Sequence, residues 1–124
     1  MRRKDDMDEP EIFVVHEFSV RPADQGKVDA GLAAIVDHIR TDHPEVLTCQ
    51  TFKQWVGPRA HRGYTWLEGF ASLQSMESGL ATPTCTEVWE PIYRLAEPGT
   101  VLRSVWLATP PELALRRNAN EPRG

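Results

Sequence analysis

The stretch Gly63–Leu80 reads G-Y-T-W-L-E-G-F-A-S-L-Q-S-M-E-S-G-L, and its periodicity changes half-way along. The first half alternates like a strand, with an aromatic or acidic side chain at every second residue. The second half spaces Leu73, Met76 and Leu80 by three and four residues, as a helix with one apolar face does. Ser72 stands at the change, where its hydroxyl can cap the first helical turn. The sequence therefore predicts a strand that leads directly into a helix.

Periodicity and turn residues predict the remaining elements on both sides of this stretch. Asp24 is expected to cap the first helix, and Pro91 is expected to kink or restart the last one. In chain order we expect a strand over Ile12–Val20, a helix from Asp24 to about Asp42, a strand over Leu47–Val56, a strand over Tyr64–Ala71, a helix over Ser72–Gly79, a helix opened by the Thr84–Glu87 capping box, and a strand over Thr100–Ala108.

This order is β-α-β-β-α-β, which predicts an α+β fold of the ferredoxin-like type. Such a fold has a four-stranded antiparallel sheet with both helices on one face. In the first strand, Ile12, Val14, His16 and Phe18 share the side expected to meet the helices, and Phe13 shares the other side with Val15. An uncovered apolar face usually marks an interface, so we expect a homodimer built sheet against sheet.

Length and composition describe an ordinary globular chain of 124 residues. We expect a disordered tail over 1–10, one domain over 11–109 and a second tail over 110–124. The net charge of -4 argues against a nucleic-acid partner, and no apolar run is long enough to span a membrane. Cys49 and Cys85 lack metal-site spacing, so we read both as reduced thiols of a cytoplasmic protein.

Three segments resemble the antibiotic-biosynthesis monooxygenase family of the dimeric α+β barrel superfamily: Val20–Gly26, His43-Pro44-Glu45, and Glu68–Met76 with the Gly79–Pro83 turn that follows. The likeness covers about residues 12–107. It implies a dimeric barrel with a pocket between helices and sheet. Members of this superfamily include cofactor-independent oxygenases of phenols and quinols, haem-degrading enzymes and polyketide cyclases.

The chain departs from the family pattern around the implied pocket. Glu68 matches the family's glutamate, but Phe70 stands where Trp is usual. Gly79 and Thr84 occupy positions where many members carry His. These departures motivate a second hypothesis besides an enzyme, namely a non-catalytic dimeric module that binds a ligand or partner. A haem-binding protein is the third.

Two residues are predicted as catalytic. His16 interrupts an apolar strand face, where an imidazole titrating near neutrality can deprotonate a phenol. The alternative is a core histidine satisfied by one partner. Glu68 lies among aromatic residues, where burial raises the pKa of a carboxyl unless a cation such as Arg103 pairs with it.

Aromatic residues are predicted to bind a flat substrate. The strand face that carries Glu68 also carries three of them, and the alternative is that this face forms the dimer interface. Two more lie four residues apart on the last helix, where they either cover a pocket or pack in the core. The predicted substrate-binding set is Tyr64, Trp66, Phe70, Trp89, Tyr93 and Arg103.

His38 and Asp42 are also four residues apart, with His43 beside them. We interpret this group as the solvated end of a helix, where the helix dipole favours His, and we expect no metal there. The leading hypothesis is a cofactor-free enzyme acting on an aromatic, quinol or polyketide-like compound. Its oxidation step relies on the substrate's own phenolate reacting with oxygen, because no flavin, nucleotide or metal motif is present.

Overall fold

The computed structural model describes residues 9–80, 83–115 and 117, without the side chains of residues 83–86. Its four strands form one antiparallel sheet in the order β2-β3-β1-β4. The elements are β1 (Ile12–Ser19), α1 (Gln25–Asp42), β2 (Val46–Lys53), β3 (Gly63–Phe70), α2 (Leu73–Leu80), α3 (Pro83–Leu95) and β4 (Leu102–Leu107), with 3-10 turns at Pro22–Asp24 and Pro111–Leu113. The predicted ferredoxin-like α+β fold is confirmed.

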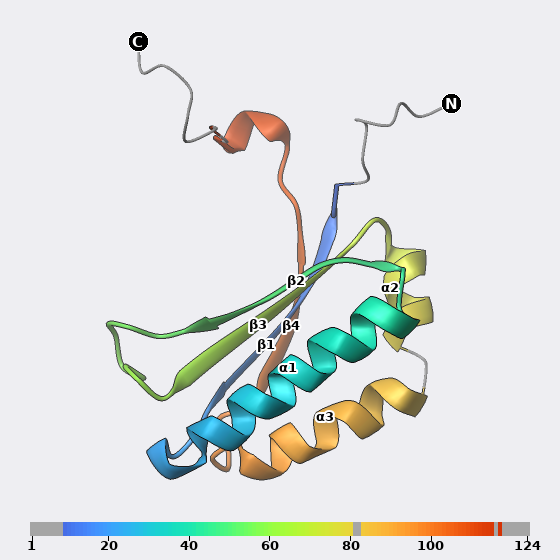
Figure 1. Ribbon diagram of the computed structural model, residues 1–124. Coiled ribbons are helices and arrows are strands. Elements are labelled where there is room, and N and C mark those ends of the chain that lie inside the picture. Colours follow the sequence, from blue (N-terminus) through green and yellow to red (C-terminus); the bar gives the residue numbers. More distant parts are fainter. Residues whose placement is uncertain (1–8, 81–82, 116, 118–124) are drawn as a thin grey trace.

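Helices α1 and α3 lie side by side across one face of the sheet, and α2 lies at its far end (Figure 1). The alternation in β1 places Val14, His16 and Phe18 under the helices, where all three are buried. Gly31 lets α1 approach α3 closely, because a Cβ there would lie 2.6 Å from Ile92 Cδ1. The opposite face of the sheet carries Phe13 and Val15, as predicted, and no helix of the described residues covers it (Figure 1).

The apolar residues beneath the helices form two clusters. The larger one packs α1 and α3 against β1 and β3, with Phe18, Ile35, Trp66, Trp89 and Ile92 among its members. The smaller one lies at the α2 end of the sheet and consists of Ile12, Val14, Phe70 and Met76. Polar side chains lie in the interior at the seam between the two clusters.

Several local predictions need correction. Asp24 does not cap α1, because its carboxylate instead accepts hydrogen bonds from Arg21 Nε and Nη2 at 3.1 and 3.0 Å. Strand β2 ends at Lys53 rather than Val56, because the chain then turns through Gly57 and His61, both with positive φ. The prediction for Ser72 is confirmed, since its Oγ accepts a hydrogen bond from the Ser75 amide at 3.1 Å.

Helix α3 runs through Pro91, so the helix does not restart there; the other predicted outcome, a kink, stays a prediction. Pro91 faces solvent, so water can hydrate the carbonyl that loses its helical hydrogen bond. The predicted cap at Thr84 lies outside the described side chains, as does Cys85, whereas Cys49 is a free thiol. In the described part of the chain, no helix combines the length and apolar character that crossing a membrane requires.

Candidate functional site

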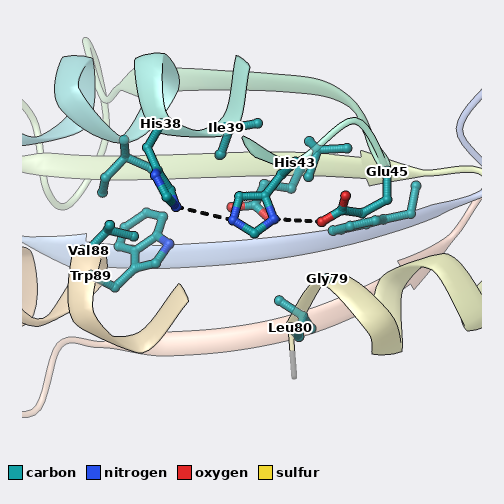
Figure 2. A pocket seen from close by; sticks show the side chains of 12 residues that line it. His38, Ile39, His43, Glu45, Gly79, Leu80, Val88 and Trp89 are labelled. Atoms are coloured by element: carbon teal, nitrogen blue, oxygen red, sulfur yellow. Dashed lines mark hydrogen bonds and ion pairs between the residues drawn. The ribbon is translucent and has the colours of Figure 1, made fainter. Parts of the chain in front are cut away.

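A small pocket lies at the seam between the two apolar clusters, where the end of α1 and the start of β2 face α2 and α3 (Figure 2). Its volume is about 20 Å³, which is room for one water molecule. Apolar side chains from α1, β3 and α3 form most of its wall. Its polar lining consists of His38, His43, Glu45 and Glu68.

Four of the polar side chains at this end of α1 form a hydrogen-bonded chain. His38 Nδ1 lies 3.0 Å from Asp42 Oδ2. His38 Nε2 lies 3.1 Å from His43 Nε2, and His43 Nδ1 lies 2.7 Å from Glu45 Oε1 (Figure 2). The Asp42 side chain is 57% exposed, the His43 side chain 10% and the Glu45 side chain 23%, so the chain has its most exposed member at Asp42 and its most buried member at His43.

The backbone at the end of α1 directs this arrangement. Pro44 prevents the helix from continuing, because its ring disfavours helical angles at the residue before it. His43 therefore leaves the helix with φ -130° and ψ 72°, although its amide still donates to the Ile39 carbonyl at 2.9 Å. Its ring reaches back to His38, five residues earlier, instead of extending the helix face.

Glu68 is the buried carboxyl of the pocket. Trp66 Nε1 donates a hydrogen bond to Glu68 Oε1 at 2.6 Å. Burial raises the pKa of Glu68, and this effect exceeds the opposing influence of the Trp66 hydrogen bond and of nearby His43 and Arg103. The sequence prediction of a raised pKa is confirmed, and Glu68 can hold a proton in a largely apolar wall.

Gly79 provides the space that Glu45 occupies. A Cβ at position 79 would lie 3.0 Å from Glu45 Oε1 and 3.2 Å from Phe70 Cε1. Both contacts are tighter than ordinary van der Waals distance. Because position 79 of α2 has no side chain, there is room for Glu45 and His43 on the opposite wall of the pocket.

His16 lies in the core rather than at the pocket wall. Its ring stacks on Trp89 with centroids 4.5 Å apart, and its Nδ1 lies 2.6 Å from the Tyr93 hydroxyl. Burial, with a smaller contribution from the positive charge of Arg103, lowers its pKa from 6.5 to about 4. The expectation that His16 titrates near neutrality is corrected, because removal of the imidazole from water disfavours its charged form.

The structure places the predicted substrate-binding residues in different parts of the molecule. Phe70 and Trp89 line the pocket, and Trp66 stands behind Glu68 as its hydrogen-bond donor. Tyr64 lies away from the pocket wall, where its hydroxyl donates to Asp29 Oδ1 at 2.8 Å. The aromatic face of β3 packs against the helices, so the alternative that it forms a sheet-to-sheet interface is corrected.

Arg103 lines a second hollow beside the pocket. This open groove of about 310 Å³ lies on the helix side of β4, with Val14, Leu80, Ser104 and Val105 as its other lining residues. Leu80 lines both hollows. Its side chain therefore lies between the small pocket that Glu45 and Glu68 line, called the acid–base pocket below, and a groove large enough for a small aromatic molecule.

Metal ligands do not gather in the described part of the chain. None of its His, Cys, Asp and Glu side chains form a group of three that could hold a metal ion. Both ring nitrogens of His38 and of His43 lie at hydrogen-bond distance from another side chain, and His16 is enclosed by Trp89 and Tyr93.

Solved structures with a similar fold include several antibiotic-biosynthesis monooxygenase-type proteins. One such protein from Caulobacter crescentus superposes with a TM-score of 0.68 at 16% identity, over 83% of this chain and 93% of that chain. SnoaB, a cofactor-independent oxygenase from Streptomyces nogalater, superposes with a TM-score of 0.57 at 17% identity, over 91% of this chain and 100% of that chain. Rv0793 from Mycobacterium tuberculosis gives a TM-score of 0.63 at 14% identity, over 80% of this chain and 95% of that chain. The fold is that of the antibiotic-biosynthesis monooxygenases. No protein-family model and no curated protein sequence matches the chain.

The interpretation of His38, Asp42 and His43 as the solvated end of a helix is wrong for His43, because its side chain is only 10% exposed and lines the pocket. Sequence reasoning assigned no role to Glu45. A partial signal was present, because His43-Pro44-Glu45 is one of the segments that carry the family resemblance. Gly79, which departs from the family pattern, lies in contact with Glu45.

Proposed function

We propose that this protein is a small-molecule enzyme that exchanges a proton with an aromatic, quinol or polyketide-like substrate, as cofactor-independent oxygenases do. The observation that carries the proposal is the convergence of Glu45, His43 and Glu68 on one pocket at the helix–sheet seam. Convergent titratable groups in a largely apolar hollow are typical of acid–base sites.

The carboxyls have different roles in this proposal. Glu45 is the base, because it is hydrogen-bonded to His43 and can pass the proton that it receives to that ring. Glu68 is the neutral acid that donates a hydrogen bond to a substrate oxygen, since burial favours its protonated form. His16, predicted as a base, is proposed instead to position Trp89, whose ring lines the pocket.

Oxygenation follows from deprotonation in such a site without a bound cofactor. Loss of a proton makes the substrate electron-rich enough to reduce dioxygen. When a ring methylene becomes a carbonyl, one oxygen atom of O₂ enters the substrate. The other leaves as water with the two hydrogens that the methylene loses.

The substrate is proposed to lie in the groove beside β4 and to reach the acid–base pocket past Leu80. Arg103 would face an oxygen anion there, and Phe70 and Trp89 would stack on a flat ring. Rotation of Leu80 is required, because the acid–base pocket alone has only about 20 Å³.

That small volume also favours a second candidate, the non-catalytic binding module. If Leu80 does not move, the pocket holds only a water molecule, and the groove alone serves as a binding surface. The two candidates differ in one measurable respect, since only the enzyme requires the Glu45 carboxylate.

We further propose that the protein forms a homodimer through its uncovered sheet face. Phe13 on β1 lies beside Trp106 on β4 in the register of the sheet, and Trp106 is 61% exposed. Both side chains project from the face opposite the helices. A large exposed apolar surface on a sheet face is typical of a subunit interface.

Oxygen uptake in the presence of a tricyclic anthrone, a polyketide-like phenolic ketone, tests the proposed activity. We expect uptake with the unmodified protein and a loss of at least about tenfold in Glu45→Gln, consistent with removal of a general base. Glu77→Gln is the matched control, because Glu77 is an exposed residue of α2 outside the pocket. Equal rates in the two variants would reject Glu45 as the base.

A further inference from the structure

The chain Asp42–His38–His43–Glu45 contains three hydrogen bonds between groups that can all accept a proton. Each of the three contacts needs one hydrogen to be attractive, since two lone pairs that face each other repel. Two neutral imidazoles supply two hydrogens. The three contacts, at 3.0, 3.1 and 2.7 Å, therefore require a third.

From this count we propose that the four side chains hold one extra, mobile proton and conduct protons between the pocket and solvent. The inference rests on the proposed function for its purpose, but the proton count itself does not. This proton wire, Asp42–His38–His43–Glu45, begins at the 57% exposed Asp42 and ends at Glu45, which lines the pocket with a side chain that is 23% exposed.

Four arrangements satisfy all three hydrogen bonds and leave each ring at least one hydrogen, with the extra proton on His38, on Glu45, on His43 or on Asp42. In the first, His38 is doubly protonated: its Nδ1–H donates to Asp42 and its Nε2–H to His43 Nε2. The His43 Nδ1–H then donates to an ionised Glu45. In the second, Glu45 carries the proton and donates it to His43 Nδ1, while His43 Nε2–H donates to His38 and His38 Nδ1–H donates to Asp42. These two arrangements contain three hydrogens and the same net charge.

The two arrangements interconvert by two short transfers. The N–H bond of His43 Nδ1 breaks as an O–H bond forms on Glu45, and the hydrogen of His38 Nε2 moves to His43 Nε2. No ring needs to rotate, and no oxidant or further reactant takes part. The extra proton thus appears at the pocket end or at the solvent end of the wire.

Charged and apolar groups from several elements surround the two imidazoles. Asp42 and Glu45 flank the pair at hydrogen-bond distance, and the Glu68 carboxyl on β3 faces it across the pocket. On the packed face of α3, the lining residues are the uncharged Val88 and Trp89. Arg103 on β4 is the nearby cation, and it acts on Glu68.

The wire makes a specific prediction for amide substitutions at either end. In Glu45→Gln the amide can donate to His43 Nδ1, and in Asp42→Asn the amide can donate to His38 Nδ1. Three hydrogen bonds then form with two neutral imidazoles, so each variant should release the extra proton. Asp37→Asn is the matched control, because Asp37 is exposed on the same helix and pairs with Arg40 at 3.1 Å.

Nitrogen-15 NMR of histidine-labelled protein, with carbon-13 detection of the Glu45 and Asp42 carboxyls, counts these hydrogens at neutral pH without any substrate. We expect three hydrogens on the two rings and the two carboxyls together in the unmodified protein and in Asp37→Asn. We expect two on the rings in Glu45→Gln and in Asp42→Asn. A count of two in the unmodified protein, or of three in both end variants, would overturn the inference. A failure of the oxygen-uptake assay would leave this count unaffected, so the two proposals fail separately.

Discussion

Acidification should destabilise this protein through His16 in a narrow and calculable range. The pKa of His16 is lowered from 6.5 to about 4 in the folded state, mainly by burial. Between these values the unfolded chain binds one more proton than the folded chain, so stability is fully present above pH 6.5 and falls as pH decreases toward 4. The slope is about 1.4 kcal/mol per pH unit, and the full loss is about 3 kcal/mol.

Denaturant unfolding across this pH interval, compared between the unmodified protein and His16→Gln, measures the effect. Both proteins share every other titrating group, so the difference between their curves isolates His16. We expect this difference to approach about 3 kcal/mol, and His61→Gln, in an exposed loop, to follow the unmodified protein. Parallel curves for the unmodified protein and His16→Gln would refute the placement of His16 as a buried neutral ring.

Four further substitutions test the site and the sheet face. Gly79→Ala should change the unfolding free energy by less than about 1 kcal/mol, because helix propensity offsets the contacts near 3 Å, yet it should displace Glu45 and shift the His43 ring signals in NMR. Glu68→Gln should be increasingly more stable than the unmodified protein as pH rises above 4.5, because the raised pKa of Glu68 opposes ionisation in the folded state; equal pH profiles in thermal unfolding would contradict this. Leu80→Ala should strengthen binding of a naphthol in calorimetry by joining the pocket to the groove; unchanged affinity would exclude Leu80 as the barrier. Trp106→Glu should yield a monomer in size-exclusion chromatography with light scattering, whereas an unchanged mass would exclude this face as the interface.

The architecture was predictable because it depends on periodicity within short segments. Alternation in β1 identified which of its residues meet the helices, and the three-to-four spacing in α1 identified its buried stripe. Alternation in β3 identified which residues share a face but not which partner covers that face. An error occurred where a side chain had another partner, as with Asp24 and Arg21, and the helix did not restart at the solvent-exposed Pro91.

The site was only partly predictable because it depends on contacts between distant segments. Glu68 was identified from its place among aromatic residues. The orientation of His43 depends on the backbone angles of a turn, and the position of Glu45 depends on the missing side chain at Gly79. The neutral state of His16 likewise depends on Trp89 and Tyr93, more than seventy residues later in the chain.

Ionisation of a phenol by the protein tests the proposed acid–base pocket most directly. The probe is 4-nitrophenol in slightly acidic buffer, where the neutral form predominates and the phenolate is recognised by its visible absorption. We predict that the unmodified protein and Glu77→Gln increase the phenolate band in a saturable manner, and that Glu45→Gln does not. A saturable increase of equal size in Glu45→Gln, or no increase with any of the three proteins, would contradict the account.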